Sequence, residues 1–226
     1  MKPRACFLTG TDTGIGKTWV TLGLMSALRA KGQKVVGMKP VASGCRQTKA
    51  GLRNEDAESI CQASTPAVSY DLVNPYAFEE PVAPHAAAEK AGVEISIPQI
   101  QAAYHQLCKL ADVVVVEGVG GWRVPLSRDQ GLVDLVKAID VPVILVVGLK
   151  LGCINHALLS CESLVRDNIQ LLGWVANQVE ADYPFLNSTM QVLRSEIPAP
   201  LLGQVPYLNV LDVEEIGQSL QCPDLV

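Results

Sequence analysis

Aromatic residues, long apolar runs and positive charge are all scarce in this 226-residue sequence. Its longest apolar run, Val141–Leu149, is much shorter than the roughly 20 residues that a membrane-spanning helix requires. Lysine and arginine number 18 against 23 acidic residues, which gives a net charge of −5. Because binding to a phosphate backbone depends on clustered lysine and arginine, this balance argues against a broad nucleic-acid surface. We therefore expect neither a membrane protein nor a nucleic-acid-binding protein.

The seven cysteines are an odd number and include no Cys-x-x-Cys pair. No secretory signal pattern precedes the first strand-like run. A disulfide framework is therefore not expected, and free thiols are typical of a protein in a reducing cytoplasm. Hydrophobic residues make up 49% of the chain, which is enough to form a core without disulfides or a structural metal.

Short apolar runs alternate with longer helical segments along the chain, as in parallel βαβ units. The predicted strands are Arg4–Thr9, Lys34–Met38, Asp112–Glu117, Pro142–Val147, Leu171–Ala176 and Leu201–Gln204. The predicted helices are Lys17–Lys31, Glu55–Ala63, Ile97–Leu110, Leu132–Ile139, Ile154–Arg166 and Phe185–Glu196. The pattern predicts an α/β fold over residues 1–226, in one domain with a single doubly wound, mainly parallel sheet and helices on both faces. The segment Thr65–Pro84 is interpreted as an irregular surface excursion.

A glycine-rich loop lies between the first predicted strand and the first predicted helix. The sequence Gly10-Thr11-Asp12-Thr13-Gly14-Ile15-Gly16-Lys17-Thr18 resembles a Walker A loop, with five residues between Gly10 and Gly16 where four are usual. Glycines let backbone amides approach phosphates, Lys17 can bridge the terminal phosphates, and the Thr18 hydroxyl can hold Mg²⁺. The loop therefore predicts a P-loop NTPase. On the loop alone, a glycine-rich turn that only caps a helix remains an alternative.

Two acidic residues are candidate metal ligands. Glu117 ends the third predicted strand, just before Gly118-Val119-Gly120-Gly121, where it can bind Mg²⁺ directly or through water. A carboxylate at a strand end can also simply cap a turn. Asp56 lies in the first turn of a predicted helix, where an acid can instead offset the helix dipole.

Seven segments, in order, make the chain similar to the dethiobiotin synthetase family over nearly its whole length. They are Thr9–Thr18, Lys39–Gly44, Asn74–Tyr76, Glu117–Trp122, Lys150–His156, Trp174–Asn177 and Ile197–Gly203. This resemblance is far more specific than the phosphate loop, which alone indicates only an NTPase. The stretches Gln178–Pro184 and Asn209–Val226 depart from the family pattern.

The resemblance implies an ATP-dependent ligase of biotin biosynthesis that acts as a cytoplasmic homodimer. Its substrates would be 7,8-diaminononanoate, CO₂ and ATP, and its products dethiobiotin, ADP and phosphate. One amine captures CO₂ as a carbamate, ATP phosphorylates the carbamate, and the second amine closes a cyclic urea. Because carbamate and γ-phosphate are both anionic, the main task is to bring two negative groups together. Lysines and Mg²⁺ are the expected counter-charges, and no covalent nucleophile is required.

The resemblance also implies roles for individual residues. Lys39, Lys17 and Thr13 are the expected catalytic residues, and Ser43 is expected to donate a hydrogen bond to the carbamate. Without the resemblance, Lys39 could equally be an exposed lysine at a strand end. The expected metal ligands are Thr18, Asp56 and Glu117. The expected nucleotide contacts are Gly14, Ile15, Gly16, Lys17, Thr18, Trp19, Asp56, Glu117, Gly118, Val119, Gly120, Asn177, Gln178, Pro206, Tyr207 and Leu208.

Asn177, at the end of the fifth predicted strand, is the candidate for base recognition. Its carboxamide offers one donor and one acceptor, which match N7 and the N6 amino group of adenine, whereas guanine presents two acceptors on that edge. The residue therefore predicts a preference for ATP over GTP. Its alternative role is only to end the strand.

The loop at Lys150–Asn155 is a candidate site for the substrate carboxylate. Free amides at a helix start, a glycine that permits close approach and the Asn155 side chain would suit an anion. The expected substrate contacts are Gly152, Cys153, Ile154 and Asn155. The family resemblance implies that this loop serves the active site of the partner subunit. Asn155 could instead be an ordinary helix cap.

Two other P-loop functions remain as alternatives. An amide-forming ATPase of the cobyrinic-acid type usually needs a glutaminase domain, for which 226 residues leave no room. A switch ATPase commonly has an additional lysine near the start of its P-loop, and Thr9–Gly14 contains none. Stimulation of ATP hydrolysis by diaminononanoate and bicarbonate, rather than by DNA, membrane or a partner protein, distinguishes the synthetase.

Overall fold

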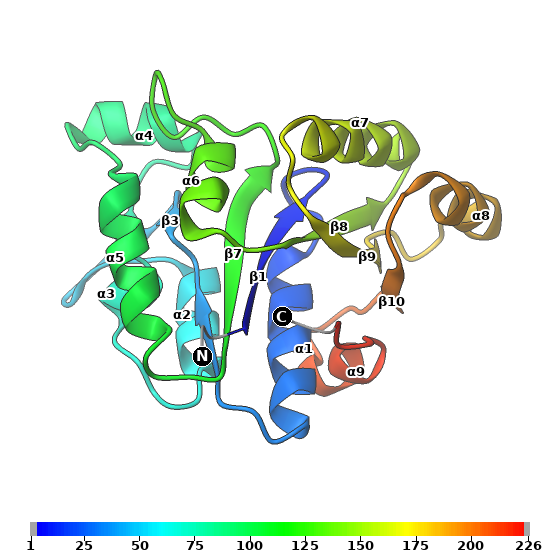
Figure 1. The fold of residues 1–226 in the computed structure, drawn as a ribbon, viewed down its shortest axis with the longest axis horizontal. Coiled ribbons are helices and arrows are strands. Elements are labelled where there is room, and N and C mark those ends of the chain that lie inside the picture. The colour runs from blue at the N-terminus through cyan, green and yellow to red at the C-terminus, as the bar shows by residue number, and fades with distance from the viewer. Residues whose placement is uncertain (1–3, 224–226) are drawn as a thin grey trace.

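A six-stranded, wholly parallel sheet forms the centre of the fold in a computed structural model that describes residues 4–223 (Figure 1). Its strands are β1 (Arg4–Gly10), β2 (Val35–Met38), β7 (Val113–Gly121), β8 (Val143–Leu149), β9 (Leu171–Gln178) and β10 (Leu201–Val205). Their order is β10-β9-β8-β1-β7-β2, and every neighbouring pair is parallel. All six predicted strands are confirmed. Residues 1–3 and 224–226, which belong to the predicted domain and the divergent C-terminal stretch, lie outside the described residues.

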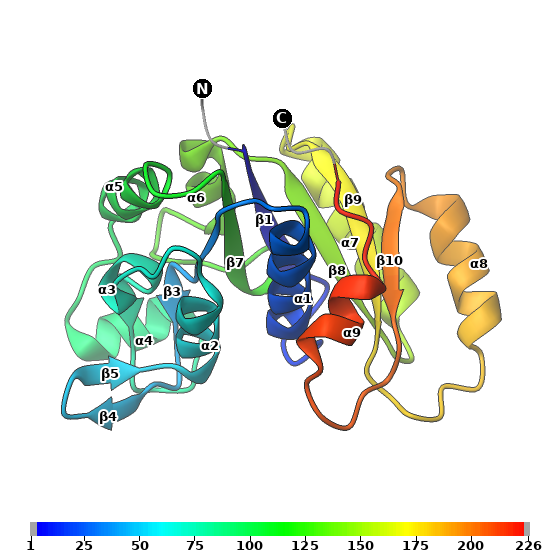
Figure 2. The ribbon, with the colours of Figure 1, turned by 90° about the horizontal axis from the view of Figure 1, so that it is seen from below.

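Helices cover both faces of the sheet (Figure 2). One face carries α1 (Lys17–Ala30), α2 (Glu55–Ala63) and α9 (Val213–Gln218), and the other α5 (Ile97–Leu107), α6 (Leu132–Ile139), α7 (Cys153–Arg166) and α8 (Leu186–Glu196). Side chains alternate along β7, so that Val113 and Val115 pack with α1 while Val114 and Val116 pack with α5 and α6. Burial on both faces explains the unbroken apolar run and confirms the doubly wound α/β fold.

The interpretation of residues 65–84 as a surface excursion is wrong. The segment contains α3 (Tyr70–Val73) and β6 (Tyr76–Ala77), and β6 pairs with β3 (Val41–Ala42). The side chains of Val73, Tyr76 and Phe78 are buried in the core. The buried Asn74 amide donates hydrogen bonds to the carbonyls of Lys39 and Tyr76, at 2.7 and 3.1 Å. These contacts hold the chain in place where it leaves β2.

Three further elements complete the described chain. β4 (Arg46–Thr48) and β5 (Gly51–Arg53) form a hairpin that leads into α2, and α4 (Pro84–Ala91) follows the segment just described. The seven cysteines, which all lie within residues 4–223, form no disulfide, and burial raises the pKa of the Cys6 thiol to about 12. None of the helices in residues 4–223 combines the length and apolar character needed to cross a bilayer.

Candidate active site

The glycine-rich loop leaves β1 and leads directly into α1, as the sequence predicts. Gly16, at the start of this helix, has a φ of +75°, in the left-handed region that favours glycine. A Cβ atom on Gly16 would lie 2.3 Å from the amide nitrogen of Asn177, so no larger residue fits without movement. The Ile15 side chain is fully buried beneath the loop and packs closely against Gly148 of β8. Packing of Ile15 against β8 therefore holds the loop against the sheet.

Lys17 lies at the first position of α1 and is largely buried. Its Nζ donates a hydrogen bond to the backbone carbonyl of Asp12, at 2.9 Å. Burial lowers the pKa of Lys17 to about 8, and the negative charge of Glu117 only partly opposes that effect. The ammonium therefore lacks a full counter-charge, which is the electrostatic condition that favours binding of an anion such as phosphate.

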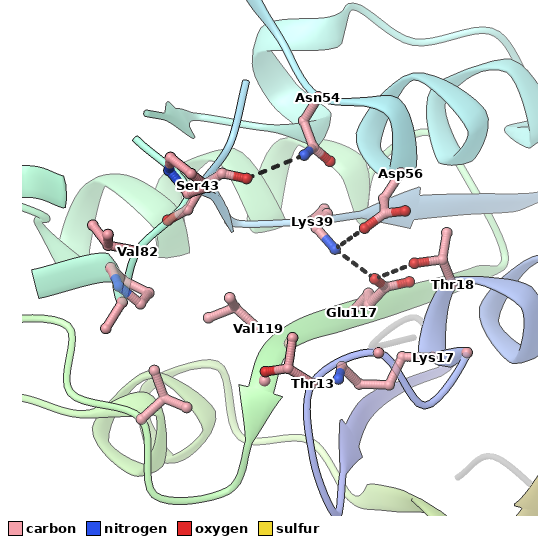
Figure 3. Close-up of a pocket in the computed structure, with 18 of the residues that line it drawn as sticks. Thr13, Lys17, Thr18, Lys39, Ser43, Asn54, Asp56, Val82, Glu117 and Val119 are labelled. Carbon is pink, nitrogen blue, oxygen red and sulfur yellow. Dashed lines mark hydrogen bonds and ion pairs between the residues drawn. The ribbon is translucent and has the colours of Figure 1, made fainter. Parts of the chain in front are cut away.

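Lys39 follows β2 directly, and its ammonium lies between two carboxylates (Figure 3). Its Nζ is 2.6 Å from Oε1 of Glu117 and 2.8 Å from Oδ2 of Asp56. The Thr18 hydroxyl donates to the same Glu117 oxygen, at 2.8 Å. Burial by itself would lower the pKa of Lys39, but the two carboxylates raise it above its usual value. These contacts show that Lys39 is a buried, paired ammonium rather than an exposed lysine at a strand end.

The residues around Glu117 fit a magnesium ion. The second carboxylate oxygen of Glu117, Oε2, is buried and has no hydrogen-bond partner. Together with the Thr18 hydroxyl and Asp56 it makes an oxygen-only donor set, which magnesium prefers. Within residues 4–223 no group of three or more His, Cys, Asp or Glu side chains could hold a metal alone. Water molecules or the phosphate oxygens of a nucleotide would therefore complete the coordination shell.

A cavity of about 660 Å³ lies between the P-loop, the segment after β2, the start of α2 and the end of β7. Its size is within the range of small-molecule sites. Because β1, β2 and β7 are parallel, the segments at their carboxyl ends meet at one edge of the sheet. The predicted site residues that line the cavity are Thr13, Gly14, Gly16, Lys17, Thr18, Trp19, Lys39, Ser43, Asp56, Glu117, Gly118, Val119 and Gly120. The buried Ser43 hydroxyl has no hydrogen-bond partner.

Several lining residues were missed by the sequence analysis. The segment Pro81–Pro84 and Val124 form an apolar wall, and Asn54 lies beside Ser43. Asn54 could have been found, because it caps α2 through a 3.1 Å hydrogen bond from the Ala57 amide, a pattern readable from sequence. The wall carries no comparable signal, because its position depends on how residues 65–84 pack.

Other predicted nucleotide contacts lie outside this cavity. The Asn177 side chain is buried beside the P-loop and donates to the Ile15 carbonyl at 2.8 Å. The Gln178 amide donates to two carbonyls in its own following turn, at 3.0 and 3.3 Å. Pro206 and Tyr207 are exposed at the surface after β10, and Leu208 packs against the core on the α1 side.

The loop before α7 also lies outside the cavity. Gly152 precedes the helix with a φ of +90°, Cys153 is buried, and Asn155 is exposed. The helix start has no side-chain cap, so the alternative role of Asn155 as a cap is wrong. Lys150 connects this loop to the P-loop through a 2.9 Å ion pair with Asp12, and this contact lowers the pKa of the Asp12 carboxyl.

A parallel sheet with a Walker A loop after β1, and a carboxylate beside it on β7, defines a P-loop NTPase. Solved structures agree with this fold, since a chain of the MinC:MinD cell division protein complex of Aquifex aeolicus superposes with a TM-score of 0.59 at 17% identity, over 96% of this chain and 86% of that one. The family model described as "AAA domain" matches residues 4–215.

Curated relatives narrow the class further. The chain is 47% identical over 223 residues to the ATP-dependent dethiobiotin synthetase BioD of Xanthomonas oryzae pv. oryzae (strain PXO99A), covering 99% of this chain and 100% of the relative. It is 48% identical over 208 residues to the protein of that name from Xylella fastidiosa (strain 9a5c), covering 92% of each chain. The chain therefore belongs to the ATP-dependent dethiobiotin synthetase family, as its seven ordered segments predict.

Proposed function

We propose that this protein is an ATP-dependent ligase that forms dethiobiotin, ADP and phosphate from 7,8-diaminononanoate, CO₂ and ATP in biotin biosynthesis. Membership of the dethiobiotin synthetase family supports the overall reaction. The observation that carries the proposal is a second buried ammonium, that of Lys39, in the same cavity as the P-loop lysine. Two cations suit a reaction that joins two anions, a carbamate and a terminal phosphate.

Lys17 and the P-loop amides would bind the phosphates of ATP. The ammonium of Lys17 would leave the Asp12 carbonyl and bond phosphate oxygens instead. The negative charge of the phosphate would compensate the buried positive charge of Lys17. Thr13 is exposed and lines the cavity, and its hydroxyl would contact the γ-phosphate as the phosphoryl group is transferred. The flanking residues Gly14, Ile15, Gly16 and Trp19 would shape the binding loop.

Lys39 and Ser43 would act on the carbamate. The first amine of the substrate attacks CO₂ and loses a proton, which leaves a carbamate anion. A carbamate oxygen then attacks the γ-phosphorus, ADP leaves, and a carbamoyl phosphate remains. The second amine attacks the carbonyl carbon, loses a proton and expels phosphate, which closes the ring. The Lys39 ammonium would reduce repulsion between the anions, and the unpartnered Ser43 hydroxyl is available to donate to the carbamate.

Thr18, Asp56 and Glu117 would hold magnesium, which when bound would neutralise charge on the β- and γ-phosphates. Glu117 contributes the buried oxygen Oε2, which has no protein partner. The backbone of Gly118–Gly120 lines the cavity beside it and would approach the γ-phosphate. With these assignments, the residues of the chain would position the substrates and stabilise the negative charge of the reacting groups.

Asn177 would recognise adenine, with Gln178 and Pro206–Leu208 near the adenosine. The buried carboxamide of Asn177 is fixed by its hydrogen bond to the Ile15 carbonyl, which orients it beside the P-loop. A fixed orientation supports discrimination between bases, because a side chain that is free to rotate could match either purine.

The active form would be a cytoplasmic homodimer, in which Gly152–Asn155 of one subunit binds the substrate carboxylate in the active site of the other. The loop lies outside its own subunit's cavity, which supports a role toward a partner. Leu151 is 92% exposed, and Leu159 and Val165 of α7 are exposed as well. Exposed apolar side chains beside the loop are suited to an interface between two copies.

The test is incubation with ATP, Mg²⁺, ¹⁴C-bicarbonate and 7,8-diaminononanoate. We expect acid-stable label in a cyclic urea, formed only when all four components are present, and ATP hydrolysis that depends on the diamine. Folded protein that binds ATP but forms no labelled urea would contradict the proposal. Hydrolysis stimulated instead by DNA, vesicles or a partner protein would favour a switch ATPase.

A further inference from the structure

Lys39 contacts the same carboxylates that would bind magnesium. Its Nζ lies 2.6 Å from Oε1 of Glu117 and 2.8 Å from Oδ2 of Asp56, and no other cation lies within ion-pair distance of either carboxylate in residues 4–223. Glu117 is fully buried and Lys39 is 6% exposed, whereas the side chain of Asp56 is 45% exposed and gives access to the pair from the cavity. Figure 3 shows the ammonium bonded to both acids, with the Thr18 hydroxyl bonded to Glu117 from the other side.

A divalent cation and the Lys39 ammonium would compete for this position. An ion bound by Glu117 and Asp56 beside Thr18 would lie within a few ångströms of the ammonium, and two cations that close repel strongly where water is excluded. The contrast with Lys17 is informative, because Lys17 donates its hydrogen bond to a backbone carbonyl and bonds neither carboxylate. Of these two lysines, only Lys39 therefore bonds the acids that would take a metal ion.

We propose that Lys39 is an exchangeable counter-ion, which pairs with Glu117 and Asp56 until a divalent cation binds them and then turns its ammonium toward the anionic substrates. The inference rests on the proposed metal and nucleotide site. It adds a coupling between metal binding and the position of Lys39. The cation that binds with ATP would also free the Lys39 ammonium to pair with the carbamate. The Lys39 charge would thus reach the reacting groups only after the metal and nucleotide are present.

The primary test measures Mn²⁺ binding to nucleotide-free protein by calorimetry or by the electron paramagnetic resonance signal of free Mn²⁺. Lys39→Met removes the competing charge and keeps an unbranched chain of similar length. We expect it to bind Mn²⁺ about tenfold or more tightly than the wild type. Lys17→Met is the matched control, a buried lysine of the same cavity that bonds no carboxylate, and we expect it to tighten Mn²⁺ binding clearly less than Lys39→Met does.

Two results would overturn the exchange. Unchanged or weaker Mn²⁺ binding by folded Lys39→Met would show that lysine and metal do not compete. If Lys17→Met increased the affinity for Mn²⁺ equally, the effect would come from the net charge of the cavity and not from competition between Lys39 and the metal. The Mn²⁺ measurement does not depend on catalytic turnover. Failure of the proposed synthetase reaction would therefore be detected separately, in the labelled-urea assay.

A second measurement needs no substitution, because Lys39→Met leaves the buried Glu117 without its counter-charge and could impair folding. Crystals of the wild-type protein with a non-hydrolysable ATP analogue would be prepared with EDTA and with Mg²⁺. We expect the Lys39 ammonium to bond both carboxylates with EDTA and to leave them with Mg²⁺. If it keeps both contacts beside a metal bound at Thr18, the exchange does not occur.

Discussion

At the scale of single residues, the two lysines of the cavity have opposite surroundings. Burial lowers the pKa of Lys17 to about 8, and its hydrogen bond goes to an uncharged carbonyl. Lys39 is also buried, but Glu117 and Asp56 raise its pKa. Phosphate binding would therefore stabilise the charged form of Lys17 strongly. Lys39, in contrast, already compensates the negative charges of Glu117 and Asp56 in the folded protein.

Replacement of Lys17 by alanine should separate activity from stability. We expect kcat/KM to fall by about 100-fold or more, the scale of losing a preorganised charge in group transfer. The thermal midpoint should change little, because Lys17 is largely buried without a paired carboxylate and its charge therefore adds little to folding. Lys39→Ala should lower the midpoint clearly, since it leaves the carboxylate of Glu117 buried and unpaired. Retention of ATP binding and turnover by Lys17→Ala would contradict the P-loop assignment.

Asn177 should determine the choice of base. The wild type should prefer ATP over GTP by about 1–3 kcal/mol, as expected for one well-placed donor and acceptor pair. Asn177→Ala should lose most of that preference, measured as the ratio of kcat/KM for the two nucleotides. Loss of its hydrogen bond to Ile15 should also lower stability by about 1 kcal/mol, which denaturant unfolding would detect. An unchanged ratio would leave Asn177 with only a structural role.

At the scale of elements, the P-loop combines backbone conformation with close packing, and two glycines allow these to be separated. Gly14 and Gly16 have nearly the same positive φ, +72° and +75°. A Cβ on Gly14 would meet nothing within 4 Å, whereas one on Gly16 would lie 2.3 Å from the Asn177 amide. Substitution at either position strains the backbone, but only substitution at Gly16 displaces a neighbour.

We therefore expect Gly16→Ala to weaken ATP binding much more than Gly14→Ala. The strain alone should cost about 1–2 kcal/mol at each position, and the contact with Asn177 adds to it only at Gly16. Calorimetric titration with a non-hydrolysable ATP analogue measures the difference. Equal losses in the two variants would mean that packing against Asn177 does not shape the loop.

The elements differ in how far the sequence predicted them. The six strands and the longer helices carry continuous apolar or helical patterns, and these were predicted with ends close to the observed ones. The segment from 65 to 84 was misjudged, because its short elements are stabilised by contacts with distant residues, such as the bond from Asn74 to the Lys39 carbonyl. Local patterns cannot report such long-range contacts.

The candidate site also contains some residues that the sequence predicted and others that it did not. The P-loop and Glu117 were predictable, because phosphate and metal binding require those residue types at strand ends. The pairing of Lys39 with both Glu117 and Asp56 was not, since it joins positions that are far apart in the sequence. The apolar wall at Pro81–Pro84 was missed for the same reason as the segment that carries it.

At the scale of the whole molecule, the loop before α7 is the part of the chain that bears on a second copy. The loop at Gly152–Asn155 is tied to its own P-loop by the ion pair between Lys150 and Asp12, yet it lies outside its own cavity. In the proposed dimer this loop would serve the partner's substrate, so each active site would contain residues of both chains. We further propose that residues 1–226 form a single domain around the one central sheet.

Mixed dimers test that arrangement. Lys39→Gln and a combined Gly152→Ala and Asn155→Ala variant should each be severely impaired alone. A heterodimer would have one active site with both defects and one with neither, so we expect up to half of the wild-type activity per dimer. Verified heterodimers with no recovered activity would assign the loop to its own subunit's site.

The central claim, that a carbamate is phosphorylated before the ring closes, is tested most directly with ¹⁸O-labelled bicarbonate. The carbamate receives two labelled oxygens from CO₂, one of which becomes the bridge to phosphorus and leaves with phosphate. The account therefore predicts, in a reaction quenched before CO₂ exchanges with water, one ¹⁸O in the released phosphate and one in the urea carbonyl of dethiobiotin. Labelled dethiobiotin accompanied by unlabelled phosphate would contradict it.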